Sequence, residues 1–354
     1  MSDIDWTRRR GADLIVCQMV SPVSRDEVWG ELPLSDGGSV SQGYYSDTRA
    51  SASVLTDAWD QYVPGAWLRL VHQVAGTSYA RTLFTGFPTS AAPSLSSGIK
   101  SVQVELKSAL YALDVERQAP VLTVGAGTSV RRALQGVCDA SRPPKPCHFE
   151  ADFNDGTLAA TRAYTSEKSL REILFDLADA GGDRVDVDER GVVTFARYLA
   201  PSLRTPSFAL SASHPLVIAG SVSGAVGTLG LPNRSIATWK NGEEELSASA
   251  DLDSGHARSA MRTGVTWAEL HDLTEAPDPP TLARVEEMAR SYLAQDSLGT
   301  DEWTLTTLWW EARAGMVGTF DPGDGGGSRK VLLKNVDSDI TARSMTHVIT
   351  LKEV

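Results

Sequence analysis

The chain has 354 residues, enough for two or three domains, and its composition of 42% hydrophobic and 22% charged residues is globular. The net charge of −12 argues against a dedicated nucleic-acid-binding surface, because such a surface needs clustered Lys and Arg. The three cysteines are too few for a disulfide framework, and their odd number indicates a reducing compartment.

Residues 1–120 predict an N-terminal β domain. Short apolar or alternating runs follow one another, at residues 14–20, 51–56, 67–74, 79–87 and 99–110. Turn clusters rich in Gly, Pro and Asp separate these runs. Antiparallel strands at this spacing favour a sandwich or a barrel.

Residues 121–204 predict an inserted α/β module, because the period of the apolar residues changes there. A first helix, capped by Ser129, has its apolar residues on one face: Val130, Ala133, Leu134, Val137 and Cys138. A second helix is predicted to begin near Ser166 and to end at Gly181–Gly182, where glycine supplies a left-handed stop. A β-hairpin over residues 185–195 follows.

Residues 205–235 predict connecting strands and a linker. Residues 205–233 contain no charged side chain, but prolines and glycines interrupt them, so we expect no stable membrane insertion. Residues 236–354 predict a C-terminal β domain with one long helix, capped by Asp278 and Pro279. The strand at 303–310 has aromatic residues on both faces, which predicts burial on both sides. Closing strands are predicted at 331–336 and 345–351.

The sequence predicts no cofactor, no metal and no enzymatic activity. Cys138, Cys147 and His148 lack the paired ligand spacing of zinc sites. Residues 152–156 and 186–191 resemble fragments of calcium loops, but their spacing or ligands are wrong, and both are interpreted as hairpin turns. No catalytic motif or nucleotide-binding fingerprint is present.

In their order, these segments resemble the tail-hub proteins of long-tailed bacteriophages, also called minor tail or tail-associated proteins and related to the baseplate hubs of contractile-tailed phages. The segments that carry the resemblance are residues 36–41, 45–51 and 67–74, residues 169–174 with the hairpin ending at 191–193, and the helix at 280–293 followed by the Trp303 strand. The resemblance covers essentially the whole chain by the order of its elements.

The resemblance implies an α+β, mainly β fold with two tail-tube-like antiparallel β-barrel domains and the inserted module. It implies a homotrimer at the tail tip of a siphophage virion, assembled in the host cytoplasm, that closes the tail tube. The implied partners are the distal tail protein, other minor tail proteins and the tape measure protein, with transient DNA passage and no specific DNA binding. Because the chain ends at Val354 after its closing strands, we expect no hydrolase extension.

Two alternatives remain open. A distal tail adaptor protein is a hexamer, and its usual architecture fits the helical module poorly. A cell-wall-degrading tail enzyme needs paired carboxylates such as Glu286 and Glu287, yet neighbouring residues on a helix point about 100° apart.

The acidic residues of the C-terminal third suggest a role in DNA passage. Residues 236–354 hold 20 acidic and 11 basic groups. An acidic channel wall would keep DNA mobile by repulsion within a Debye length of about 8 Å. The candidate channel-facing acids are Glu243, Glu244, Glu245, Asp321 and Asp324. A solvated outer surface is the alternative interpretation for them.

Overall fold

The computed structural model describes residues 13–35, 38–96, 99–117, 122–225, 231–241, 244–256, 259–273, 281–296, 301–340 and 345–354. The chain forms two compact units, residues 1–222 with 304–351 and residues 223–303 with 352–354. The four-part division at residues 120, 204 and 235 stays a prediction.

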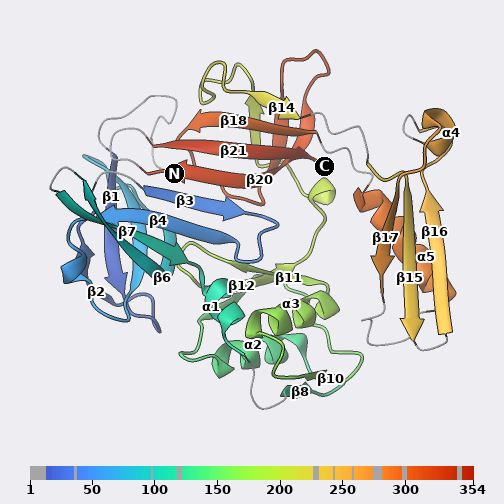
Figure 1. The fold of residues 1–354 in the computed structure, drawn as a ribbon, viewed down its shortest axis with the longest axis horizontal. Coiled ribbons are helices and arrows are strands. Elements are labelled where there is room, and N and C mark those ends of the chain that lie inside the picture. Colours follow the sequence, from blue (N-terminus) through green and yellow to red (C-terminus); the bar gives the residue numbers. More distant parts are fainter. Residues whose placement is uncertain are drawn as a thin grey trace. The chain divides into compact units, whose positions relative to one another are not determined.

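The larger unit contains one continuous, mostly antiparallel sheet (Figure 1). Its strands from the first third are β1 (Asp13–Val20), β2 (Val28–Leu32), β3 (Gly38–Gly43), β4 (Ala50–Thr56), β5 (Trp67–Val74), β6 (Ala80–Ser96) and β7 (Ile99–Lys107). The later strands are β13 (Phe208–Ser211), β18 (Glu302–Leu308), β19 (Val317–Asp321), β20 (Arg329–Asp339) and β21 (Thr346–Glu353). A 3₁₀ turn, η1 (Trp59–Gln61), precedes β5.

Strand β6 bends the sheet, because its two halves pair with different neighbours. Residues 80–86 pair with β5, residues 87–96 pair with β7, and the register shifts between Pro88 and Ser90. The order is β14-β18-β21-β20-β3-β4-β7-β6-β5-β1-β2, where β14 spans Ser223–Ala225, with β19 beside β20 and β13 parallel to β19. Both sides of the bend bury one apolar cluster, which includes Cys17, Leu68 and Val104. The predicted mainly β, α+β fold is confirmed, and closure of either half into a barrel stays a prediction.

Strand β18 differs from its prediction in burial. Trp303, Leu305 and Thr307 are buried, whereas Thr304 between them is exposed. The strand is therefore covered on one face only. The prediction of burial on both faces was wrong because Trp309 and Trp310 lie beyond the end of the strand, where alternation no longer assigns them to a face.

The helices of the module pack on a small sheet, and helices and sheet contribute to one apolar core. Its elements are α1 (Ala109–Val115), β8 (Leu122–Val124), α2 (Val130–Ala140), β9 (Cys147–Phe149), β10 (Arg162–Tyr164), α3 (Leu170–Gly181), β11 (Asp183–Val187) and β12 (Val193–Arg197), followed by η2 (Pro201–Leu203). Helix α1 was missed, because the alternating pattern predicted a strand up to Leu110. The small sheet has the order β11-β12-β9, and the core includes Leu134, Leu174 and Phe195.

Local signals set the ends of the module helices. The Ser129 hydroxyl accepts from the Arg132 N–H at 3.3 Å, as its predicted capping role requires. Helix α3 begins at Leu170, not near Ser166, because Ser169 and Glu172 form a reciprocal capping box. Gly182 ends this helix at φ +73°, as predicted.

The smaller unit is a three-stranded sheet covered on one face by a helix. The sheet and its flanking helices are β15 (Arg234–Asn241), β16 (Glu244–Asp251), α4 (Ala260–Thr263), β17 (Ala268–Asp272) and α5 (Leu282–Asp296). Strand β15 lies between antiparallel β16 and parallel β17. Ala237 and Trp239 of β15 pack with Val285 and Ala289 of α5.

The predicted cap of the long helix, Asp278 and Pro279, lies outside the described residues. The helix is described from Leu282, and the Thr281 hydroxyl accepts from the Arg284 N–H at 3.3 Å. In the part of the chain that the structure describes, no helix has the length and apolar character needed to cross a membrane.

Candidate functional site: the joint between the sheet and the module

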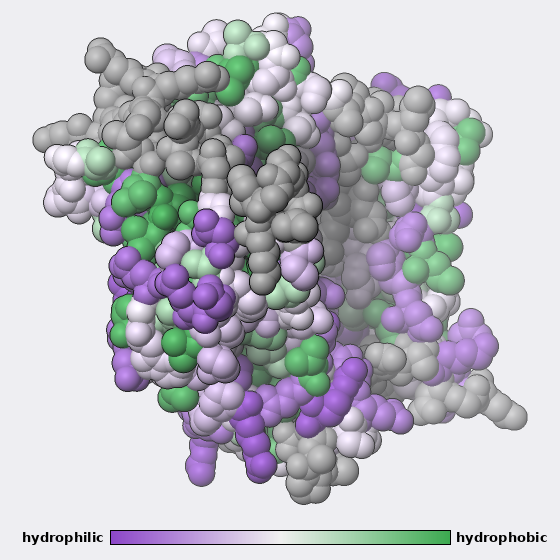
Figure 2. Space-filling model, turned by 60° about the vertical axis from the view of Figure 1, so that its left-hand side comes forward, coloured by the Kyte–Doolittle hydropathy of each residue, from purple (hydrophilic) through white to green (hydrophobic). Residues whose placement is uncertain are grey.

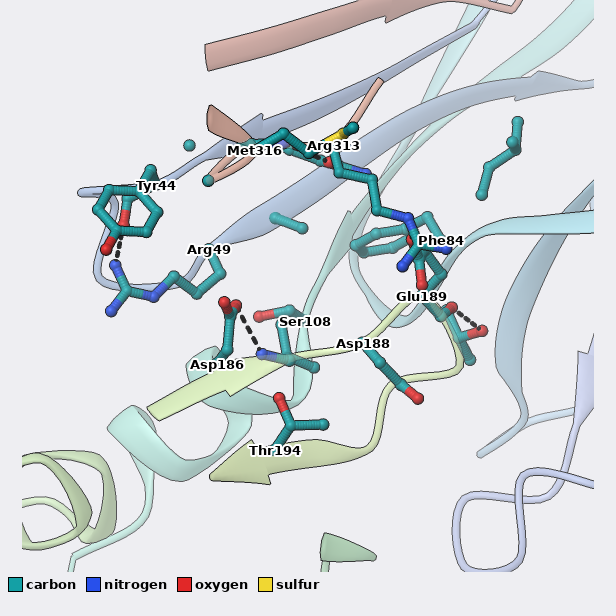
Figure 3. A pocket seen from close by; sticks show the side chains of 18 of the residues that line it. Tyr44, Arg49, Phe84, Ser108, Asp186, Asp188, Glu189, Thr194, Arg313 and Met316 are labelled. Atoms are coloured by element: carbon teal, nitrogen blue, oxygen red, sulfur yellow. Dashed lines mark hydrogen bonds and ion pairs between the residues drawn. The ribbon is translucent and has the colours of Figure 1, made fainter. Parts of the chain in front are cut away.

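A polar cavity of about 310 Å³ lies between the bent sheet and the β11–β12 hairpin of the module (Figure 3). Its walls come from the β3–β4 turn, from β6, from the hairpin and from the loop before β19. The charged or hydroxyl-bearing residues that line it are Tyr44, Arg49, Thr85, Ser108, Glu150, Arg184, Asp186, Asp188, Glu189, Thr194 and Arg313.

Arg49 fastens the β3–β4 turn to the base of the hairpin. Its Nε and Nη2 atoms donate to the Val185 carbonyl at 3.3 and 3.2 Å, and its Nη1 atom donates to the carbonyls of Ser46, at 3.2 Å, and Tyr44. Burial lowers the pKa of Arg49, and the nearby Asp186 carboxylate opposes that shift. The residue has φ +58°, which is uncommon for a side chain of this size. Its half-buried guanidinium is thus held by backbone carbonyls on both sides of the joint.

Glu189 fastens the tip of the hairpin. Its carboxylate lies 2.6 Å from Arg313 Nε and 3.7 Å from Arg81 Nη2. The Thr85 hydroxyl donates to the Glu189 carbonyl at 2.8 Å. Figure 3 shows Glu189 and Arg313 at the end of the cavity opposite Arg49. The hairpin is therefore bound to the sheet at both ends, with the cavity between.

Gly191 lets the hairpin turn approach the sheet closely. Its φ is +76°, and a Cβ atom at this position would lie 3.2 Å from the Thr85 carbonyl and 3.5 Å from Arg25 Nε. Arg25 is 1% exposed and also has a positive φ, +60°. Its guanidinium lies 3.4 Å from the centroid of the Trp67 ring. Burial and then the neighbouring Arg69 lower the pKa of Arg25 to about 9.

The polar groups that line the cavity are suited to holding the module against the sheet. Among its described lining residues there is no Cys or His, so they offer neither a thiol nucleophile nor an imidazole base. The Ser108 hydroxyl donates to the Thr48 carbonyl at 2.5 Å, and the Asp188 carboxylate accepts from the Val192 N–H at 2.8 Å. Burial raises the pKa of Asp188. Within the described ranges, no group of His, Cys, Asp and Glu side chains is arranged to hold a metal ion.

None of the predicted channel-facing acids that the structure describes is among the residues that line this cavity. Glu243 lies outside the described residues. Glu244 and Glu245 are exposed at the start of β16 in the smaller unit, and Glu245 pairs with Lys240 at 3.3 Å. Asp321 ends β19 in the larger unit, where its carboxylate accepts from the Gly323 N–H at 2.9 Å.

Asp324 completes this set, in the loop after β19. It pairs with Arg329 at 2.6 Å, and the Gly326 N–H that it accepts lowers the pKa of its carboxyl. Glu245 and Asp324 therefore carry their own cationic partners, whereas no ion pair links Glu244 or Asp321 to a described residue. Whether these acids face a channel stays a prediction.

The cysteines that were considered as metal ligands, and the glutamates that were considered as catalytic carboxylates, contact other residues of the fold. Cys138 is fully buried on the apolar face of α2, as predicted, and the Cys147 thiol donates to Gln135 Oε1 at 3.1 Å. On the solvent-facing side of helix α5, Glu286 pairs with Arg290 and Glu287 with Arg284.

The two segments interpreted as hairpin turns have separate outcomes. Residues 186–191 form the β11–β12 turn, as predicted. Residues 152–156 do not form a hairpin turn, because the strands on either side of them, β9 and β10, pair with β12 and β8 and not with each other. The Asp155 carboxylate in this segment accepts from the Ser129 hydroxyl at 2.8 Å and pairs with Arg131 at 3.3 Å.

Arg25 and Arg49 were not predicted as functional residues. Arg49 contacts a carbonyl 136 positions away, and no local pattern encodes a contact at that separation. The only available signal was the polar turn around Arg49, which is common to many surface loops.

No protein-family model and no curated protein matches the sequence. Solved structures do match its fold over nearly the full length. The tail protein from Neisseria meningitidis MC58 is 13% identical, with 97% of each chain covered and a TM-score of 0.72. The 43 kDa tail protein of prophage MuSo2 from Shewanella oneidensis is 12% identical, with 96% of this chain and 98% of that chain covered and a TM-score of 0.68.

A third structure, the prophage tail protein gp18 from Listeria monocytogenes EGD-e, is 11% identical, with 96% and 94% covered and a TM-score of 0.57. The likeness includes the module as well as the sheets, because few residues of this chain or of the compared chains lie outside the matched part. The chain therefore has the fold of phage tail proteins, as the order of its elements along the sequence predicted.

Proposed function

We propose that the chain is a structural virion protein that forms a hub at the tip of a phage tail. The observation that carries this proposal is the likeness to two tail proteins, one of them from a prophage, over at least 96% of every chain compared. If this chain and those proteins shared only one domain, large parts of each chain would not be covered by the match. The joint supports a structural role, because its charged groups bind the module to the sheet and its lining residues lack an imidazole or a thiol.

The proposed hub is a homotrimer that closes the tail tube and opens for DNA passage. Strand β2 ends the strand order and pairs with β1, so one of its edges is open in the described sheet. Apolar side chains are exposed on these two strands, with Leu14 at 50%, Val28 at 46% and Trp29 at 41%. Figure 2 brings this side of the molecule forward and shows hydrophobic side chains among hydrophilic ones. Neighbouring subunits in a closed ring would cover such an edge.

In this proposal the chain contacts the distal tail protein, other minor tail proteins and the tape measure protein. DNA passes without specific binding. The acids Glu244, Glu245, Asp321 and Asp324 border the channel, and the two without described ion-pair partners contribute most of the repulsion.

Electron cryomicroscopy of tails that carry a gold-labelled version of this chain tests the proposal. We expect label at the tail tip with three copies per particle. Six copies in one ring would favour the distal adaptor instead. Label in the tail shaft, or none in purified particles, would refute the tip position. A cleared band on a cell-wall zymogram, lost in a Glu286→Gln variant, would establish the enzyme alternative.

A further inference from the structure

A second cavity in the larger unit combines apolar walls with two cations, the buried Lys145 and the exposed Arg142. It has a volume of about 670 Å³ and opens between the β5–β6 side of the sheet and helix α1 of the module. Its lining residues are Tyr62, Gly65, Ala66, Trp67, Phe87, Pro88, Ala112, Val115, Glu116, Arg142, Pro143 and Lys145. Val115 on its rim is 59% exposed.

The cations around this groove have no carboxylate at ion-pair distance among the described residues. Lys145 is 4% exposed, and its Nζ atom donates to Ser141 Oγ at 3.3 Å and to the Pro143 carbonyl at 2.6 Å. Arg25 lies against Trp67, and its Nε and Nη2 atoms are buried with no hydrogen-bond partner. Burying cations without a counter-charge is costly, so an anionic group at this place would relieve the cost.

Glu116 is the one acid in the wall, and it does not neutralise the groove. Its Oε1 atom accepts the backbone N–H of Arg142 at 2.9 Å, which leaves the Arg142 guanidinium without a described partner. Arg142 and Lys145 therefore outnumber Glu116, and Arg25 adds a third cation behind Trp67. The end of the groove at residues 142–145 is cationic, and the rest is aromatic and aliphatic.

We propose that this groove docks an extended peptide segment of a neighbouring protein, with a carboxylate side chain flanked by apolar ones. The carboxylate would lie at Arg142 and Lys145, and the apolar side chains would lie on Trp67, Phe87 and Val115. The complementary charge selects an acidic segment, and the apolar walls select against a fully hydrated anion. The inference deepens the proposed hub function, since it names one surface by which the hub holds another tail component.

The probe is the peptide acetyl-Leu-Glu-Leu-amide, compared with acetyl-Leu-Gln-Leu-amide. The readout is the methyl NMR signals of Ala112 and Val115 in the full chain, because both residues line the groove. We expect saturable shifts with a dissociation constant about tenfold lower for the Glu peptide, as one charge-assisted hydrogen bond would give. Equal binding of the two peptides would overturn the proposal.

Variants separate the groove from general charge effects. Arg142→Gln should weaken binding of the Glu peptide about threefold and leave the Gln peptide unchanged. Arg132→Gln is the matched control, because Arg132 is also exposed but lies outside the groove. An unchanged affinity in Arg142→Gln, or an equal loss in Arg132→Gln, would contradict the assignment.

Two further probes exclude other occupants. Sodium acetate that binds as tightly as the Glu peptide would mean a site for free carboxylate, and tighter binding of the oligonucleotide dT4 would mean a nucleic-acid site. Either result overturns the docking of a peptide. The outcome is independent of tail localisation, because a chain absent from tails can still bind the peptide, and a chain at the tail tip can fail to bind it.

Discussion

The buried His347 should make the sheet acid-sensitive. The residue lies on β21 and is 1% exposed. Its Nε2 atom lies 2.9 Å from the Trp310 carbonyl, to which it donates, and its Nδ1 atom accepts from the Ser338 hydroxyl at 2.9 Å. Burial lowers the pKa of His347 from 6.5 to about 4, and the nearby Arg81 and His72 add to the shift.

The sign and size of the effect follow from linkage. The unfolded chain binds a proton at His347 near pH 6.5, whereas the folded chain resists it until about pH 4. The part of the unfolding free energy that depends on neutral His347 is therefore present above about pH 6.5 and is lost as the pH falls towards 4. The full loss is about 3 kcal/mol, of which about 2 kcal/mol falls between about pH 7.5 and pH 5.

Hydrogen exchange of peptides from β20 and β21, measured across a urea series, reports the unfolding of this part of the sheet. The wild type should lose about 2 kcal/mol more unfolding free energy between the two pH values than His347→Gln. The variant is the control, because it does not titrate and all carboxylates remain. An equal loss in both proteins, or higher stability at pH 5 than at pH 7.5, would refute the reasoning.

Three other substitutions test the module and its joint. Ser169→Ala should destabilise α3 by about 1 kcal/mol in hydrogen exchange, whereas Ser166→Ala should cost less than about 0.5 kcal/mol; equal costs would contradict the capping box. Arg49→Lys keeps the charge but loses the donation of two N–H groups to the Val185 carbonyl. The opening free energy of the β11 amides, measured by hydrogen exchange, should therefore fall by about 2 kcal/mol, and an unchanged value would show that Arg49 does not hold the hairpin. Gly191→Ala should cost about 1 kcal/mol more in thermal unfolding than Gly127→Ala, since both have similar positive φ but only Gly191 meets the Thr85 carbonyl; equal costs would exclude that contact.

The sequence alone determined the elements whose signals are local. Helix α2 follows from the spacing of its apolar face and from the Ser129 cap, and both lie within one turn of the residues they control. The left-handed end of α3 at Gly182 and the β11–β12 hairpin follow in the same way. The order of these elements was also sufficient to predict the mainly β fold of phage tail proteins.

The tertiary structure decided which distant elements meet. Alternation predicts a strand but not its partner, so the pairing of Val40 in β3 with Ser338 in β20 could not be inferred. The same holds for Arg49, whose role depends on a carbonyl in another part of the fold, and for the buried Arg25 beside Trp67. Burial and long-range contact give these side chains their energetic weight, and neither is encoded by the residues next to them in the chain.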